Sequence, residues 1–144
     1  MVARIITLGD ALPMASELSN YLANEILGWV AGEAMPTAPT TVYVALFSAD
    51  PTAAGTLTNE VTTTIRAGGR VAIDWTTITA REITNELAVD FGSAAGGASV
   101  THFGLFDAAT VGNMLAWSAL DTPRTIVAAD PVVFPVGDLA FNFN

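Results

Sequence analysis

VTHFGLFDAATVGNML, residues 100–115, contains two apolar runs joined by a short polar loop. The runs on either side of loop 107–113 are rich in apolar and aromatic residues, a composition typical of buried strands. The loop ends in Gly112 and Asn113, two residue types that tolerate the positive φ angles of a tight chain reversal. The sequence therefore predicts a β-hairpin here, with antiparallel strands flanking the loop.

Strand signals continue on both sides of this hairpin. The run 41–48 is apolar on both faces, which indicates a strand that is covered from both sides. In 70–77, apolar residues alternate with smaller or polar ones, as expected for a strand with one buried face. The expected strands are 41–48, 70–77, 87–91, 100–106, 114–119, 125–127, 132–134 and 139–143. Short strands separated by Gly, Asn, Asp and Pro predict a mainly β chain, folded as an antiparallel β-sandwich or a barrel-like domain.

One α-helix is expected near the N-terminus. An apolar stripe at helical spacing runs from Leu18 to Trp29. Ser16 suits the N-cap and Gly32 suits the C-terminal stop, so the pattern predicts a helix over about residues 17–31. We expect the stripe to pack on the sheet of its own chain. The alternative is that Trp29 contacts a partner protein.

Length and composition indicate one domain preceded by an arm. The 144 residues suffice for a hydrophobic core that needs no stabilising disulfide or metal. The sequence has no cysteine, so no disulfide can form. Residues 1–12 are expected to form an extended arm, and residues 13–144 a single β-rich domain that includes the helix. We expect the arm to lie along a neighbouring subunit by strand addition, with Ile5, Ile6 and Leu8 as contacts.

The charge balance excludes several classes of partner. Five arginines and no lysine stand against 14 acidic residues, for a net charge of −9. Such a chain would repel a phosphate backbone, so we expect no nucleic-acid partner. The uncharged segments are too short and too polar to cross a bilayer, so we expect no membrane partner. The N-terminus lacks the apolar core of a secretory signal, which favours accumulation in a cytoplasm.

Candidate catalytic residues are few. A hydrolytic site could use the single histidine as general base, a carboxylate to orient it, and a serine nucleophile. The residues of such a site would be His102, Asp107, Asp90, Ser99 and Ser118. However, no G-x-S-x-G elbow occurs, and strand alternation places His102 on one face with Val100, Gly104 and Phe106. This position favours a structural role for the histidine.

Metal and phosphate motifs are also missing from the sequence. The carboxylates are scattered, and no loop has the D-x-[DN]-x-[DN]-G spacing of a calcium site. The Gly-rich segment 92–97 matches no phosphate-binding motif. We therefore predict a protein that is not an enzyme, with no catalytic residue, no cofactor and no metal.

The low charge is itself informative. Only 13% of the residues are charged, against about 25% in a typical globular protein. Soluble monomers commonly protect exposed sheet edges with charges, lysine above all, whereas large uncharged patches mark protein interfaces. We therefore expect a structural subunit whose edges are covered by neighbouring subunits.

Several segments resemble a family of small virion proteins of tailed bacteriophages, whose members are labelled tail-fibre or head-decoration proteins. The resemblance covers roughly residues 18–141 and is most specific in 101–115. In 67–70 the chain has Ala-Gly-Gly-Arg, where family members often have Gly-Tyr-Ala-Arg, so the arginine is retained. The segments that carry the resemblance are 41–51, 59–61, 83–85, 89–91, 100–115 and 134–139.

The resemblance implies a structural protein of the virion. We expect a capsid decoration (cement) protein that binds the outside of the phage head and bridges copies of the major capsid protein. Self-association is expected, with a trimer favoured because it would match local threefold points of the shell. The alternative is a tail component, such as a fibre, tail-tip or adaptor subunit, with tail proteins as partners and host-surface binding as a further role. In either case the protein is made in the host cytoplasm, and the expected partner contacts are Ile5, Ile6, Leu8 and Trp29.

Overall fold

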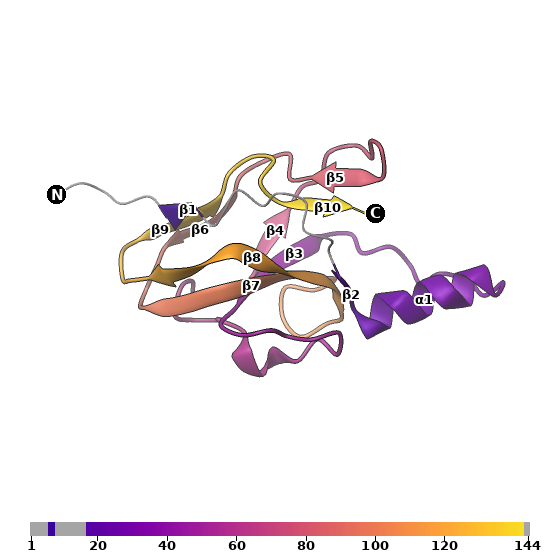
Figure 1. Ribbon diagram of the computed structural model, residues 1–144, viewed down its shortest axis with the longest axis horizontal. Coiled ribbons are helices and arrows are strands. Elements are labelled where there is room, and N and C mark those ends of the chain that lie inside the picture. The colour runs from indigo at the N-terminus through magenta and orange to yellow at the C-terminus, as the bar shows by residue number, and fades with distance from the viewer. Residues whose placement is uncertain (1–5, 8–16, 143–144) are drawn as a thin grey trace.

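The computed structural model describes residues 6–7 and 17–142 (Figure 1). The chain is mainly β with one α-helix near the N-terminus, as predicted. The elements in chain order are β1 (Ile6–Thr7), β2 (Glu17–Leu18), α1 (Asn20–Val30), β3 (Val42–Phe47), the short 3-10 helix η1 (Leu57–Asn59), β4 (Val71–Ile73), β5 (Glu82–Thr84), β6 (Val89–Ser93), β7 (Ala98–Phe106), β8 (Met114–Ile126), β9 (Pro131–Phe134) and β10 (Ala140–Asn142).

The strands form a sandwich-like arrangement of sheets. The largest sheet has the order β2-β8-β7-β3-β4 and is antiparallel throughout. A second sheet has the order β1-β9-β6, with β1 parallel and β6 antiparallel to β9, and β10 pairs with β5. The main core combines buried side chains of both larger sheets, among them Val44, Phe103, Leu120, Phe91 and Phe134. The predicted antiparallel sandwich is thus confirmed.

Strand β3 is covered on both faces, as its apolar run predicted. Val44 and Leu46 belong to the main core. Ala45 and Phe47 belong to a second buried cluster with Phe106, on the opposite face of the same sheet. The central position of β3 between β7 and β4 therefore explains why no polar residue interrupts it.

The hairpin around loop 107–113 is confirmed, but its second strand is longer than predicted. Strand β8 joins the two separate predicted strands, 114–119 and 125–127, into one that pairs with β7 as far as Ile126. Pro123 lies in the part of β8 opposite a register shift, which is a position that tolerates a residue without an N–H.

That register shift also corrects the predicted faces of β7. It falls between Val100 and His102 and breaks the strict alternation of side chains. Val100 consequently lies in the main core with Phe103, whereas Phe106 lies in the second cluster. The prediction that His102 shares its face with Val100 is wrong for this reason.

Two other regions differ from the predicted strands. The expected strand 70–77 contains a much shorter strand, β4, and β5 was not predicted. Strand β5 has a partner distant in sequence, β10, and it is followed by the buried residue Asn85. The Asn85 side chain donates to the carbonyl oxygens of Leu87 and Pro135 and accepts from the N–H of Leu139 at 2.9 Å. This one residue therefore joins the segment after β5 to the connection between β9 and β10.

The helix begins later than predicted. Its N-cap is Ser19, not Ser16, because Glu17 and Leu18 form β2 along β8. The predicted C-terminal stop is confirmed. Gly32 has φ +95°, and the N–H of Glu33 donates to the carbonyl oxygen of Gly28 at 2.9 Å, which closes the last turn.

Candidate interaction surfaces

The residues of the hypothetical hydrolytic site make other contacts. His102 is half-buried on β7, and its Nδ1 lies 2.8 Å from Oγ1 of Thr101. The Asp90 carboxylate accepts from the N–H of Gly92 at 2.7 Å, which makes it part of a turn. The Ser118 hydroxyl donates to the carbonyl oxygen of Ala119. Among the described residues, His102 hydrogen-bonds to neither a carboxylate nor a serine, so the structure does not bring this site together.

Within residues 6–7 and 17–142, no group of three or more His, Asp or Glu side chains is placed to hold a metal ion. In the same ranges, no helix is long and apolar enough to span a bilayer. Two exposed surfaces stand out in the described part of the chain, the loop 107–113 and the helix α1.

The first such surface is the loop 107–113 at the end of the β7–β8 hairpin. The Asp107 carboxylate accepts from the backbone N–H of Asn113 at 2.7 Å and from its side-chain amide at 2.8 Å. Val111 and Gly112 both have positive φ, +55° and +64°. A β-branched residue rarely adopts that conformation, so Val111 is held there by its surroundings. Its side chain is 73% exposed at the tip of the loop.

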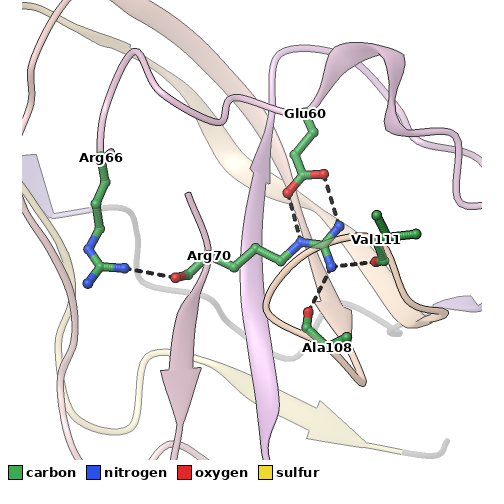
Figure 2. Close-up of polar contacts among 5 residues, drawn as sticks. All are labelled: Glu60, Arg66, Arg70, Ala108 and Val111. Carbon is green, nitrogen blue, oxygen red and sulfur yellow. Dashed lines mark hydrogen bonds and ion pairs between the residues drawn. The ribbon is translucent and has the colours of Figure 1, made fainter. Parts of the chain in front are cut away.

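A buried arginine holds this loop from beneath. Nη1 of Arg70 donates to the carbonyl oxygens of Ala108 and Val111 at 2.8 and 2.7 Å. Nε and Nη2 of Arg70 donate to the two carboxylate oxygens of Glu60 at 2.8 and 3.0 Å (Figure 2). The guanidinium carbon also lies 3.6 Å from the centre of the Phe106 ring. Arg70 therefore joins the loop, the segment before β4 and the second core cluster.

Sequence reasoning did not assign this role to Arg70. The available signal was the arginine that the family resemblance retains at this position. A cavity of about 320 Å³ lies beside it, lined by Leu57, Thr62, Gly69 and Val111 among others. All the bonds that Arg70 makes go to groups of its own chain, so it positions the loop and offers no free charge to a ligand.

The second surface is helix α1. None of its residues is buried, and Leu27, Trp29 and Val30 are 65, 62 and 71% exposed. Figure 1 shows the helix extending away from the sheets, with its first turn beside β2 and its last turn clear of the other elements. Of the predicted apolar stripe, Leu18, Tyr21, Leu22 and Ile26 are half-buried, whereas Trp29 and Val30 are exposed. The expected packing of the stripe on its own sheet is therefore wrong for the end of the helix.

Contacts at its N-terminal end fix the direction of the helix. The Ser19 hydroxyl accepts from the N–H of Leu22 and donates to the carbonyl oxygen of Met114. The N–H groups of Ser19 and Asn20 donate to the carbonyl oxygens of Leu115 and Ala53 at 3.0 and 2.8 Å. These bonds reach into β8 and into the loop after β3, so they join the first turn of the helix to the domain, whereas Leu27, Trp29 and Val30 near its last turn are exposed.

A groove accompanies the attached end. It has a volume of about 390 Å³ and lies between the first turn of the helix, the returning segment 35–39, and the β7–β8 hairpin. Tyr21, Leu22 and Leu115 line it, together with the carboxylate-bearing Asp107. The groove does not include Leu27, Trp29 or Val30, so these residues remain a separate surface.

The predicted arm lies largely outside the described residues. Ile5 and Leu8 are not described, and of Ile6 only the backbone is, in β1 opposite Val132 of the same chain. The contact of these three residues with a neighbouring subunit stays a prediction, as does the division into an arm over 1–12 and a domain over 13–144. Of the four predicted partner contacts, Trp29 is the one whose side chain the structure describes.

A comparison with known proteins identifies the family of the chain. The family model described as "Podophage GP4 fiber I protein gp80" matches residues 17–142, from β2 to the end of β10. No curated protein gives a significant match to the chain. The matched region contains both surfaces described above, and it includes the hairpin that carried the resemblance. The chain belongs to the podophage GP4 fiber I protein gp80 family.

Proposed function

We propose that the protein is a non-enzymatic structural subunit of a phage tail fibre. The observation that carries the proposal is the family match, which extends over residues 17–142 and names a fibre protein. The match supports a virion structural role, and it favours the tail alternative over the head decoration that the sequence first suggested. Decoration of the capsid exterior therefore becomes the competing outcome of the test below.

The structure offers two features that suit such a subunit. The helix α1 presents apolar side chains away from the sheets, and the loop 107–113 is held in a defined shape by Arg70. Both are positions at which a neighbouring virion protein could be bound. The supporting sandwich keeps its own core, so each surface can be occupied without unfolding the domain.

The test is the location and copy number of the chain in purified virions. Immunogold labelling with antibodies against the domain should mark the tail, and quantitative mass spectrometry should give a handful of copies per particle. Labelling over the whole head with hundreds of copies would contradict the proposal and favour the decoration role. Absence of the chain from purified virions would contradict both the tail-fibre role and the decoration role.

Self-association belongs to this proposal as well. A trimer was expected from the sequence, and sedimentation velocity of the purified chain over a range of concentrations tests it. A monomer at all concentrations would contradict the trimer without affecting the tail location, because the partners of a fibre subunit can be other proteins.

A further inference from the structure

The end of helix α1 is apolar over an unusually wide part of its circumference. Leu27, Val30 and Trp29 follow one another around the axis, and at 3.6 residues per turn they span about 160°. Contact with a single neighbouring helix covers a narrower stripe. All three side chains are more than half exposed. We call these three residues the helix-tip surface. Its width suits a groove on a partner protein that surrounds the end of the helix.

Charges around the helix-tip surface indicate which charged side chains would suit the rim of the partner's groove. No lysine or arginine stands between Arg4 and Arg66, so the helix and its flanks are entirely without basic groups. Glu25 lies in the helix, and Glu33 lies three residues after its last residue, Val30. Side chains with a positive charge on the rim of a partner groove would therefore meet complementary charges.

A second copy of the chain fits these observations poorly. Each copy carries a net charge of −9 and has five basic residues in total. Arg70 is buried against Glu60, and a nitrogen of Arg66 donates to the Arg70 carbonyl oxygen. Pairing of two copies through the helix-tip surface would thus bring their glutamates together with no basic side chain in the helix or its sequence flanks to offset them.

The caps of the helix support binding in a fixed geometry. Ser19 joins the first turn to β8, and Gly32 closes the last turn. A helix that is held in its bound conformation before association loses less conformational entropy when it binds. The tip is therefore presented to a partner without the ordering cost of a flexible segment.

We propose that the helix-tip surface inserts into an apolar groove, rimmed by lysine or arginine, on a different protein of the same virion. This proposal rests on the proposed function, since it takes the partner from the virion. The mode is that of an amphipathic helix in a groove, with Leu27, Trp29 and Val30 as anchors. The rim charges set orientation and association rate, and the anchors supply most of the affinity.

Photo-crosslinking in assembled particles tests the partner directly. The photoreactive residue p-benzoylphenylalanine is introduced in place of Leu27, and as control in place of Ile78, which is 80% exposed on the turn before β5. Particles purified after assembly with each full-length variant are irradiated, and the crosslinked peptides are identified by mass spectrometry. We expect the variant at position 27 to crosslink to another virion protein at a site flanked by lysine or arginine, and the control not to reach that site.

Other outcomes are decisive as well. A crosslink to a second copy of the chain, to a site without basic residues, or no crosslink in particles that contain the chain would overturn the inference. All three results would leave the proposed function intact. If particles contain no copies of the unmodified chain, the proposed function itself is contradicted, and the inference about the helix-tip surface falls with it.

Two pairs of variants give an independent measurement. Leu27→Glu should lower the number of copies per particle about tenfold, while Ile78→Glu leaves it unchanged. Glu33→Lys should lower it as well, whereas Glu86→Lys, the same charge change at an exposed site beyond β5, should not. Circular dichroism and thermal melting establish that each variant folds like the unmodified protein. Equal incorporation of Leu27→Glu and Ile78→Glu would contradict a role of the helix-tip surface in attachment.

Discussion

Nε of Arg70 lies 2.8 Å from Oε1 of Glu60, and Nη2 lies 3.0 Å from Oε2, so the two side chains meet at two points. Their side chains are 2% and 8% exposed. The desolvation of two charges is costly, and it is offset here because both carboxylate oxygens and three guanidinium nitrogens are used. The pair is therefore tolerated in the interior, and removal of either partner would leave an uncompensated buried charge.

Substitution of the acidic partner tests this. Glu60→Ala leaves the Arg70 guanidinium buried without its counter-charge, so we expect the free energy of unfolding to fall by about 3–5 kcal/mol. Urea denaturation followed by tryptophan fluorescence measures the change. The control, Glu86→Ala, removes an exposed carboxylate and should alter stability by no more than about 0.5 kcal/mol. Similar losses for both variants would show that burial of the pair has no special energetic role.

Arg70→Lys tests the positioning of the loop 107–113. A lysine keeps the charge, but its single ammonium cannot reproduce the four hydrogen bonds to Glu60, Ala108 and Val111. We expect amide hydrogen exchange in the loop to accelerate, while the amides of β9 keep their protection. Uniform acceleration over the whole domain would indicate a global loss of stability instead of a local release.

Gly112→Ala should be more damaging than the same change at Gly137. Both glycines have positive φ, +64° and +79°. A Cβ at Gly112 would lie 2.4 Å from Oδ1 of Asp107 and 2.6 Å from Cβ of Ala108, whereas nothing lies within 4 Å at Gly137. We expect about 1–2 kcal/mol of backbone strain in each variant and a further loss at Gly112, measured by thermal melting. Equal losses of stability in the two variants would mean that the loop accommodates the added Cβ at position 112 without a further energetic cost.

Asn85→Ala removes the three side-chain bonds that connect Leu87, Pro135 and Leu139. Because Asn85 is 0% exposed, the partner groups would be left buried and unsatisfied. We expect a loss of about 2–4 kcal/mol in the free energy of unfolding. Asn24→Ala, at an exposed position of α1, is the control and should be nearly neutral. A neutral Asn85→Ala would show that water replaces the missing amide.

Local signals were sufficient to predict the hairpin and the central strand. Loop 107–113 carries its own turn residues, and the run at β3 is apolar because neighbouring strands and two buried clusters surround it. These features depend on residues close in sequence or on composition alone. The helix C-terminus was predictable for the same reason, since Gly32 acts on the turn directly before it.

Features that depend on distant contacts could not be predicted. The sequence pattern favoured Ser16 as the N-cap, whereas Ser19 is the N-cap because Glu17 and Leu18 pair with the distant strand β8. The register shift after Val100 and the pairing of β5 with β10 also require knowledge of the partner strand. The exposure of the helix end belongs to this group, because periodicity shows that a helix face is apolar but does not show which element covers that face. The role of Arg70 also belongs here, because its partners Ala108 and Val111 are distant in sequence.

The attachment of α1 at a single end has a mechanical consequence. At the N-terminal end of α1, a tensile force on the helix is transmitted to the domain through Ser19 and Asn20. Their hydrogen bonds go to β8 and to the loop after β3. Strand β8 is paired with β7 along its length, so the load is shared by the longest ladder in the molecule. A fibre subunit tethered by this helix would therefore transmit tension on that side to the β7–β8 hairpin.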